Sequence, residues 1–341
     1  MLELTRTLCG LSGVSSREED VRSYLANALR PHVTHMETDA MGNLIAFKAG
    51  RKRTGSKLLL DAHMDEVGIM VSGYTADGCL RFSFVGGMDR RVVIGKRVYI
   101  GKERILGIFG MKPVHLSTKE ERKSVPKLES LYIDIGAKDE AEARARVELG
   151  EVGVFDPETL LFGDGFLKAK AIDDRAGCAA LLKLAREELP MDCTFVFSTQ
   201  EEVGTRGAFA SSFSVKPEIA LVLEATTAAD LPGTPSGKRV CVPGNGVVIP
   251  YMDGGTIYDR RLFEQLRALA EEHQIPWQTK EYLSGGTNGR VYQRSRSGVR
   301  VAGLAVATRY LHAPTSVAAV RDLEGMLCLA RLMIDRIAEE S

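Results

Sequence analysis

The sequence lacks an excess of charge of either sign and lacks any long apolar run. Its 45 lysines and arginines balance its 45 aspartates and glutamates, so no basic excess exists to neutralise nucleic-acid phosphates or an anionic membrane surface. No segment approaches the roughly 18 consecutive apolar residues of a membrane-spanning helix. We therefore expect neither nucleic acid nor a membrane as a partner.

Secretory signals and paired cysteine motifs are also missing. Residues 1–10 lack the basic, apolar and small-residue sections of a secretory signal, which predicts a cytoplasmic protein. The six cysteines are scattered without a C-x-x-C pair, and most lie in apolar runs. This pattern favours reduced thiols in the core over a disulfide framework.

What the chain does contain is enough apolar material for two domains, since 44% of its 341 residues are hydrophobic. Strand-like and helix-like segments alternate in residues 1–65 and 165–341, as is typical of an α/β domain. Residues 66–164 instead hold short apolar runs punctuated by glycine, as in a small antiparallel barrel or sandwich. The simplest architecture is one α/β domain with a β-rich domain inserted into it.

Three local boundaries are expected within the α/β domain. Arg17–Leu29 is expected as a helix capped by Ser15 or Ser16, because acids follow these serines by three residues. Ile219–Leu223 is expected as a strand that ends before an acid. Ser316–Ala338 is expected as the closing helix.

Two histidines follow apolar segments, where open α/β sheets bind their ligands. His63 ends the run Leu58–Ala62, and His312 lies between the expected strand Val299–Val306 and the closing helix. Residues i and i+2 of a strand share a face, so Asp65 can hold one nitrogen of His63 and leave the other free for a metal. For either histidine taken alone, a structural role beside a neighbouring acid is the favoured alternative.

Acidic residues follow three further apolar segments. A helix N-cap explains one of Asp173 and Asp174 but not both, and a carboxylate can bridge two cations. Adjacent carboxylates such as Glu201 and Glu202 point in different directions, so one can bind a metal while the other acts as a base. Glu224 follows a strand in the same way. A solvated strand end is the alternative for Glu201, Glu202 and Glu224 taken alone.

Five of these residues in one α/β domain indicate a metal centre made of two imidazoles and three carboxylates. They are His63, Asp173, Glu202, Glu224 and His312. A ligand set without thiolate suits zinc, cobalt or manganese better than copper(I) or an iron–sulfur cluster. With one bridging carboxylate it would serve two metals about 3.5–4 Å apart.

In order and combination these motifs resemble the glutamyl aminopeptidase and tetrahedral aminopeptidase family of dinuclear metallopeptidases, some of whose members are labelled endoglucanases. The resemblance covers essentially the full length of the chain. It is carried by His63–Gly68, Ala171–Gly177, Glu201–Gly204, Glu224, Ser284–Thr287 and His312 before Pro314. It implies an α/β, mixed-sheet, phosphorylase/hydrolase-like catalytic domain with an inserted small β-barrel.

The resemblance also implies a role for each site residue. The implied ligands are His63, Asp173 and Glu224 for one metal, and Asp173, Glu202 and His312 for the other. Asp65 would orient His63, and Glu201 would be the general base that helps a metal-activated water to hydrolyse the first peptide bond of a peptide with a free amino terminus. The implied cofactors are two divalent metal ions per chain, which could be zinc, cobalt or manganese. The implied assembly is a twelve-subunit particle built from dimers, and the insert takes part in forming each dimer.

Four positions depart from the usual family pattern. Glu224 and Asn288 stand where Asp is common, Ala313 where Ser is common, and Ser316 where Glu is common. None of these changes removes an implied ligand. They leave the substrate preference and the metal affinity open.

Two other functions stay as alternatives. A glycoside hydrolase would use paired carboxylates, but the imidazoles would be surplus, and adjacent Glu201 and Glu202 are poorly placed to flank one glycosidic bond. A non-catalytic assembly protein could keep the metal shell, although loss of chemistry usually deletes a ligand or the base. The basic residues considered for contact with an acidic substrate side chain are Arg239, Arg260, Arg290 and Arg294.

Overall fold

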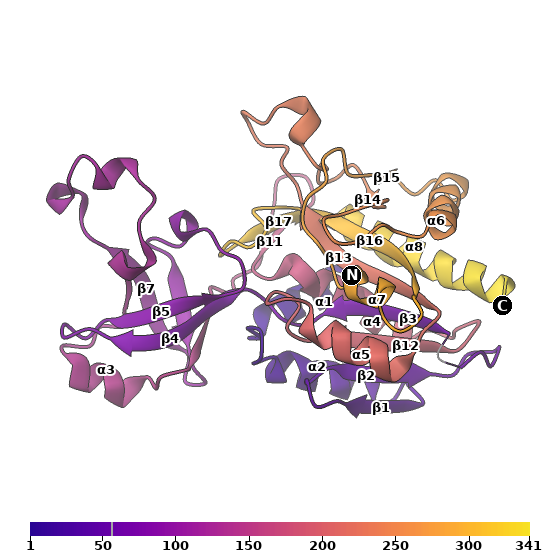
Figure 1. Cartoon of the computed structure of the whole chain (residues 1–341), viewed down its shortest axis with the longest axis horizontal. Helices are drawn as coiled ribbons and strands as arrows, with labels where there is room; N and C mark the ends of the chain where they lie inside the picture. The colour runs from indigo at the N-terminus through magenta and orange to yellow at the C-terminus, as the bar shows by residue number, and fades with distance from the viewer. Residues whose placement is uncertain (56) are drawn as a thin grey trace.

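The strands form one open sheet and one closed barrel (Figure 1). The computed structural model describes residues 1–55 and 57–341. The order in the open sheet is β1-β2-β12-β3-β13-β16-β17-β11-β10, with β14 beside β16 and β15 beside β14. The bounds are β1 (His35–Thr38), β2 (Leu44–Lys48), β3 (Leu58–His63), β10 (Leu160–Phe162), β11 (Phe166–Ala169), β12 (Cys193–Ser198), β13 (Ile219–Thr227), β14 (Val247–Val248), β15 (Trp277–Gln278), β16 (Arg300–Arg309) and β17 (Ser316–Ala319).

The centre of the open sheet is parallel and its margins are antiparallel. β12 with β3, β3 with β13 and β13 with β16 are parallel pairs, whereas β2, β17, β11 and β10 pair antiparallel. Every residue of β3 is buried, which explains its nearly unbroken apolar sequence, since central parallel strands are covered on both faces. The carboxyl ends of β12, β3 and β13 therefore meet at one edge of the sheet.

Helices cover both faces of this sheet. One face carries α1 (Leu2–Gly10), α2 (Glu19–Leu29), α4 (Ile172–Ala185), α6 (Arg260–Glu272) and α8 (Val320–Glu339), and the other carries α5 (Arg206–Val215) and α7 (Gly289–Gln293). Leu58 and Leu60 pack into the core between the sheet and the first set of helices, and Leu59 packs into the core beneath α5 and α7. The reason is that successive strand residues face opposite sides of a sheet.

The closed sheet is a six-stranded antiparallel barrel in the order β4-β5-β8-β7-β6-β9. Its elements are β4 (Gly68–Tyr74), β5 (Leu80–Val85), β6 (Arg97–Ile100), β7 (Ile105–Met111), β8 (Leu131–Asp134), β9 (Val152–Phe155) and the helix α3 (Glu140–Arg146). Phe109 packs against Phe82 and Phe155 in a core of its own, with ring centroids 5.1 and 5.8 Å apart. The expected mixed-sheet α/β domain with a small β-barrel is confirmed.

We propose that the inserted domain ends between Phe155 and Leu160. Strand β10 lies inside the range 66–164 expected for the insert, yet it pairs with β11 in the open sheet. The pattern of short apolar runs and glycines, which predicted the end of the insert near Gly165, therefore includes the first strand of a hairpin in the open sheet.

Two strand boundaries differ from those expected. Ser316–Ala319 is a strand that pairs with β11 and β16, so the closing helix starts only at Val320. β13 continues to Thr227, which places Glu224 within the strand and not beyond its end. In both places, pairing with neighbouring strands overrides the local sequence pattern.

The expected serine cap of α2 is also absent. The helix begins at Glu19 without a side-chain cap at Glu18, and the hydroxyl of Ser15 donates instead to Asp65. All six cysteines are free, and four of them are buried. Within residues 1–55 and 57–341, the helices include none with the length and apolar character needed to cross a membrane.

A buried ion cluster fixes the point where the chain leaves the open sheet for the barrel. Glu66 lies between β3 and β4, and its two carboxylate oxygens accept hydrogen bonds from Lys170 Nζ, both at 2.7 Å. Arg175 Nη2 donates to the same carboxylate at 3.1 Å. The three side chains are at most 3% exposed. Arg175 also donates to the carbonyl oxygens of Leu8 and Met64, so the cluster joins α1, α4 and the connection to the barrel.

Replacing Glu66 by Gln should lower the free energy of unfolding by about 3–5 kcal/mol, because two buried cations would lose their shared counter-charge. Urea-induced unfolding monitored by circular dichroism would measure the change. Glu121→Gln removes a carboxylate from an exposed pair with Lys112 and serves as the control, with an unfolding midpoint near that of the unmodified chain. Equal midpoints for both variants would contradict a stabilising role for the cluster.

Candidate metal centre

The predicted site residues converge at the carboxyl ends of β12, β3 and β13. His63 is the last residue of β3, and Glu201 and Glu202 lie in the turn after β12. Val222 of β13 pairs with Asp61 of β3, and this register brings Glu224, two residues further on, level with His63. Asp173 and His312 reach the same edge from the start of α4 and from the turn between β16 and β17.

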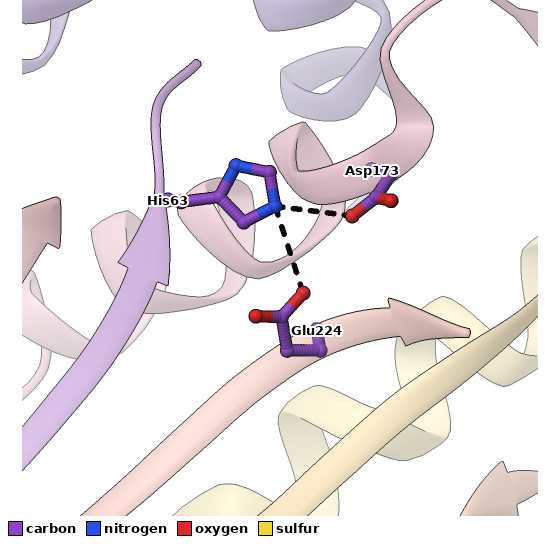
Figure 2. Close-up of side chains that lie close together, drawn as sticks. All are labelled: His63, Asp173 and Glu224. Carbon is purple, nitrogen blue, oxygen red and sulfur yellow. Dashed lines mark hydrogen bonds and ion pairs between the residues drawn. The ribbon is translucent and has the colours of Figure 1, made fainter. Parts of the chain in front are cut away.

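The first group of three side chains contains His63, Asp173 and Glu224 (Figure 2). His63 Nε2 lies 3.1 Å from Asp173 Oδ1 and 3.6 Å from Glu224 Oε2. His63 is only 1% exposed. Glu224 Oε1 is buried and has no hydrogen-bond partner among the residues described.

The second group contains Asp173, Glu202 and His312. His312 Nε2 lies 3.1 Å from Glu202 Oε2 and 3.5 Å from Asp173 Oδ2. The side chain of His312 is 37% exposed, so this group lies on the more open side of the site. Asp173 directs one oxygen to each histidine and thereby joins the two groups.

Asp65 organises both groups from below. Its carboxylate accepts hydrogen bonds from the backbone N–H groups of Glu201 and Glu202, at 2.9 and 3.1 Å, and from the hydroxyl of Ser15 at 2.6 Å. His63 Nδ1 lies 3.1 Å from the backbone oxygen of Asp65 and 3.4 Å from its Oδ1. Asp65 therefore fixes the position of the His63 imidazole relative to the turn that follows β12. The hydrogen bond from Ser15 to Asp65 was not predicted, because the two residues are far apart along the chain.

The protonation equilibria reveal a surplus of negative charge. Burial raises the pKa of Glu201 to about 8, and the carboxylates of Glu202 and Asp65 add to the rise. Burial also raises the pKa of Glu202, and that of Glu224 to well above its usual range. Burial would lower the pKa of His312, but Asp173 and Glu202 outweigh it and raise that pKa to about 11. These groups therefore keep protons that reduce the repulsion between the carboxylates. A bound cation would reduce the same repulsion.

The donor set fits divalent cations. Each group offers one imidazole nitrogen and two carboxylate oxygens within 4.8 Å of one another, which is the mixture that zinc, cobalt and manganese accept. The buried Oε1 of Glu224 would otherwise be a costly unpaired acceptor.

A cavity of about 300 Å³ opens beside the centre. The groups that line it include His63, Asp173, Glu201, Glu224, Lys280 and His312. Glu201, predicted as the base, therefore faces the cavity together with residues from both groups. Lys280 was not among the basic residues predicted to contact a substrate. No local sequence pattern indicates it, because Lys280 comes close to the site only when the chain folds. The four arginines that were considered are not among the described residues that line this cavity.

The positions that depart from the family pattern lie in different surroundings. Asn288 lies beneath the centre, where its amide donates to Asp61 and Ser198, both at 2.8 Å. Ala313 and Ser316 line a narrow gap beside Asp173 and His312.

Comparisons with known proteins identify the family of this chain. The family model of the M42 glutamyl aminopeptidases matches residues 42–329. A putative aminopeptidase of Acetivibrio thermocellus is 34% identical over 99% of this chain and 98% of its own length. The TET aminopeptidase of a marine sediment archaeon, Thaumarchaeota archaeon SCGC AB-539-E09, is 29% identical and superposes with a TM-score of 0.93 over 99% of this chain and 98% of that one.

A further solved structure is the TET1 peptidase of Pyrococcus horikoshii, which can assemble into a tetrahedron or a large octahedral shell. It is 29% identical to this chain and covers 98% of both chains with a TM-score of 0.87. The resemblance inferred from the motifs is confirmed, and the chain belongs to the M42 glutamyl aminopeptidase family.

Proposed function

We propose that this aminopeptidase-family chain binds two divalent cations and removes the first residue of peptides with a free amino terminus, with Glu201 as the general base. The observation that carries the proposal is that the two oxygens of Asp173 face two different histidines. A second carboxylate accompanies each histidine, which is the arrangement of a bridged pair of metal sites. Family membership supports the aminopeptidase activity.

The five proposed ligands would hold the cations in two sites. His63, Asp173 and Glu224 form one site, and Asp173, Glu202 and His312 form the other. Cations bound there would supply Lewis acidity, which lowers the pKa of water and polarises a carbonyl group.

Glu201 would perform the proton transfers. Its carboxylate would take a proton from the attacking water and deliver it to the leaving amine. Its burial and its place on the cavity wall support this role, since a base must reach the reacting atoms and hold a proton near neutral pH. The hydrogen bond from the Glu201 N–H group to Asp65 fixes the backbone that carries the base.

The observed contacts disfavour both alternatives. In a glycoside hydrolase the two carboxyl groups must flank one glycosidic bond, whereas here three of the carboxylates cluster around His63 and His312. A non-catalytic protein would have no need for Glu201 on the cavity wall.

The first test of this function is a metal-dependent hydrolysis assay. Metal-stripped protein should release no amino-terminal residue from short peptides, and added zinc, cobalt or manganese should restore release at about two equivalents per chain. Peptides with a blocked amino terminus should resist cleavage. Hydrolysis of a soluble β-glucan without peptide cleavage would establish the glycoside hydrolase, and metal binding without any hydrolysis would establish the assembly protein.

Glu201→Gln should depress kcat by roughly 10²-fold or more while metal content stays normal, because the amide cannot accept the proton. Turnover and metal analysis on the same preparation would measure both effects. Glu264→Gln, at an exposed residue of α6, is the matched control and should keep full activity. A fully active Glu201→Gln variant would show that another group is the base.

We further propose that copies of this chain associate into dimers through the barrel and that the dimers form a dodecamer. The ability of the similar Pyrococcus horikoshii peptidase to form closed shells supports the proposal. So does the exposure of Val114, Leu116 and Val125 on one loop of the barrel, since clustered apolar side chains mark interaction surfaces.

Light scattering coupled to size-exclusion chromatography would test the assembly. The expected particle has about twelve times the chain mass of 37.2 kDa. A monomer at all concentrations would contradict the proposal.

A further inference from the structure

Glu18 is a buried acid outside the proposed metal centre. It lies just before α2 and is 2% exposed, and it is not among the described residues that line the cavity beside the centre. Burial raises the pKa of Glu18 to about 7, and the nearby carboxylate of Asp65 adds to the rise. A buried acid beside a second acid is costly unless its oxygens accept hydrogen bonds. The donors to Glu18 therefore indicate what this side chain does.

The donors are two backbone N–H groups. Glu18 Oε1 accepts one hydrogen bond from the N–H group of Ser16, at 2.8 Å, and another from that of Gln200, at 3.2 Å. Ser16 belongs to the same segment as Glu18, whereas Gln200 is 182 residues away and immediately precedes the proposed base, Glu201. Glu18 therefore connects the start of α2 to the turn that follows β12.

Side chains also accept the neighbouring N–H groups of this turn. Beyond the last residue of β12, the backbone N–H groups of residues 199–202 all donate to side chains, at 2.9–3.2 Å. The acceptors, in the order of the donors, are Asn43, Glu18 and, for the last two, Asp65. Such N–H groups need these acceptors because they lie past the ladder of the sheet. Side chains from three separate segments thus determine the path of the turn.

The conformation of Gln200 explains why the hydrogen bond to Glu18 matters. Gln200 has a φ of 54°, in the left-handed region that residues with a side chain rarely adopt. Its N–H group, bound by Glu18, fixes the peptide plane before its Cα atom, and the N–H group of Glu201, bound by Asp65, fixes the plane after it. Only φ and ψ rotate between two peptide planes. The two carboxylates therefore hold Gln200 in the left-handed conformation, which directs the chain towards Glu201 and Glu202.

We propose that Glu18 is a positioning residue whose Oε1 atom holds Gln200 in the left-handed conformation, and that it thereby places the base Glu201 and the ligand Glu202 at the metal centre. The inference rests on the proposed aminopeptidase function and adds to it a residue that lies outside the cavity. Acceptance of the hydrogen bond from Gln200 is the property that this role requires, and the negative charge of Glu18 is not.

Two conservative variants separate the reach of the side chain from its charge. Glu18→Gln keeps an acceptor oxygen and removes the charge, and it should keep kcat within a few-fold. Glu18→Asp keeps the charge but is one methylene too short to reach Gln200, and it should lower kcat by roughly 10- to 100-fold with KM nearly unchanged. Glu19→Asp, at an exposed neighbouring residue, is the matched control and should keep full kcat. Full activity of Glu18→Asp, or loss of activity in Glu18→Gln, would overturn the role.

Cobalt binding distinguishes positioning from a general loss of structure. Glu202 lies on the turn, whereas the proposed ligands His63 and Glu224 do not. In Glu18→Asp, one bound Co²⁺ should therefore be weakened by roughly 10-fold, and the other should keep its original affinity. The visible absorption bands of Co²⁺, recorded during titration of the metal-stripped protein, would measure both affinities. Loss of both cations together from one fraction of the molecules would overturn the positioning role.

A second substitution tests the mechanism through the backbone. Glycine adopts the left-handed region without steric cost. Gln200→Gly, added to Glu18→Asp, should therefore raise both kcat and the weakened cobalt affinity by roughly 5- to 10-fold. Gln200→Ala in the same background also removes the Gln side chain but keeps a Cβ atom, and it should restore neither quantity. Equal effects of Gln200→Gly and Gln200→Ala would overturn the mechanism.

The outcomes separate this inference from the function on which it rests. If the unmodified, metal-loaded enzyme cleaves no peptide, the aminopeptidase proposal is overturned, and the cobalt affinities of the Glu18 variants still test the positioning role. If the unmodified enzyme cleaves peptides and Glu18→Asp matches it in both kcat and cobalt affinity, only the role of Glu18 is overturned. Should Glu18→Asp not fold, loss of activity in Glu18→Gln would still overturn that role.

Discussion

The carboxylate of Asp65 is the point on which the arrangement of the site depends. It joins the end of β3 to the turn after β12 by accepting hydrogen bonds from two backbone N–H groups and from a hydroxyl. The Nδ1 atom of His63 lies 3.4 Å from the same carboxylate. Burial alone would raise the pKa of Asp65, but His63 and these donors hold that pKa below its usual value. The group is therefore ionised, and an ionised acceptor makes short, directional hydrogen bonds. One buried charge thus sets the positions of an imidazole, a proposed base and a proposed ligand.

The residue after Asp65 performs a different task with the same kind of chemistry. Glu66 points to Lys170 and Arg175, which precede and follow Asp173 along the chain. The start of α4 is therefore held on both sides by side chains anchored to Glu66. Asp65 and Glu66, which follow β3, connect the turn that carries Glu201 and Glu202, the start of α4 at Asp173 and the root of the barrel, although these parts are far apart in the sequence.

Much of this could be predicted from the sequence, for a physical reason. A buried parallel strand is mostly apolar, so an acid or histidine at or just after its end stands out, as at His63 and Glu202. The different sequence patterns of the two domains have the same cause. Central strands of the open sheet are buried on both faces, whereas strands of a small barrel are buried mainly on the inner face. What the sequence could not show depends on partners distant along the chain. Ser316–Ala319 is a strand because β11 and β16 pair with it. Ser15 donates a hydrogen bond to Asp65 and does not cap α2, and Lys280 lines the cavity although it is distant from the site residues along the chain.

The barrel joins the open sheet by two connections that both border the site. Glu66, Val67 and Phe155, at its root, line a narrow gap together with Asp173 and His312. The loop that carries Val114 and Val125 leaves the barrel between β7 and β8 and projects from it (Figure 1). Sequence change is therefore constrained unequally along the insert. A substitution at the tip leaves the surroundings of His312 unchanged, whereas a substitution at the root would reshape them.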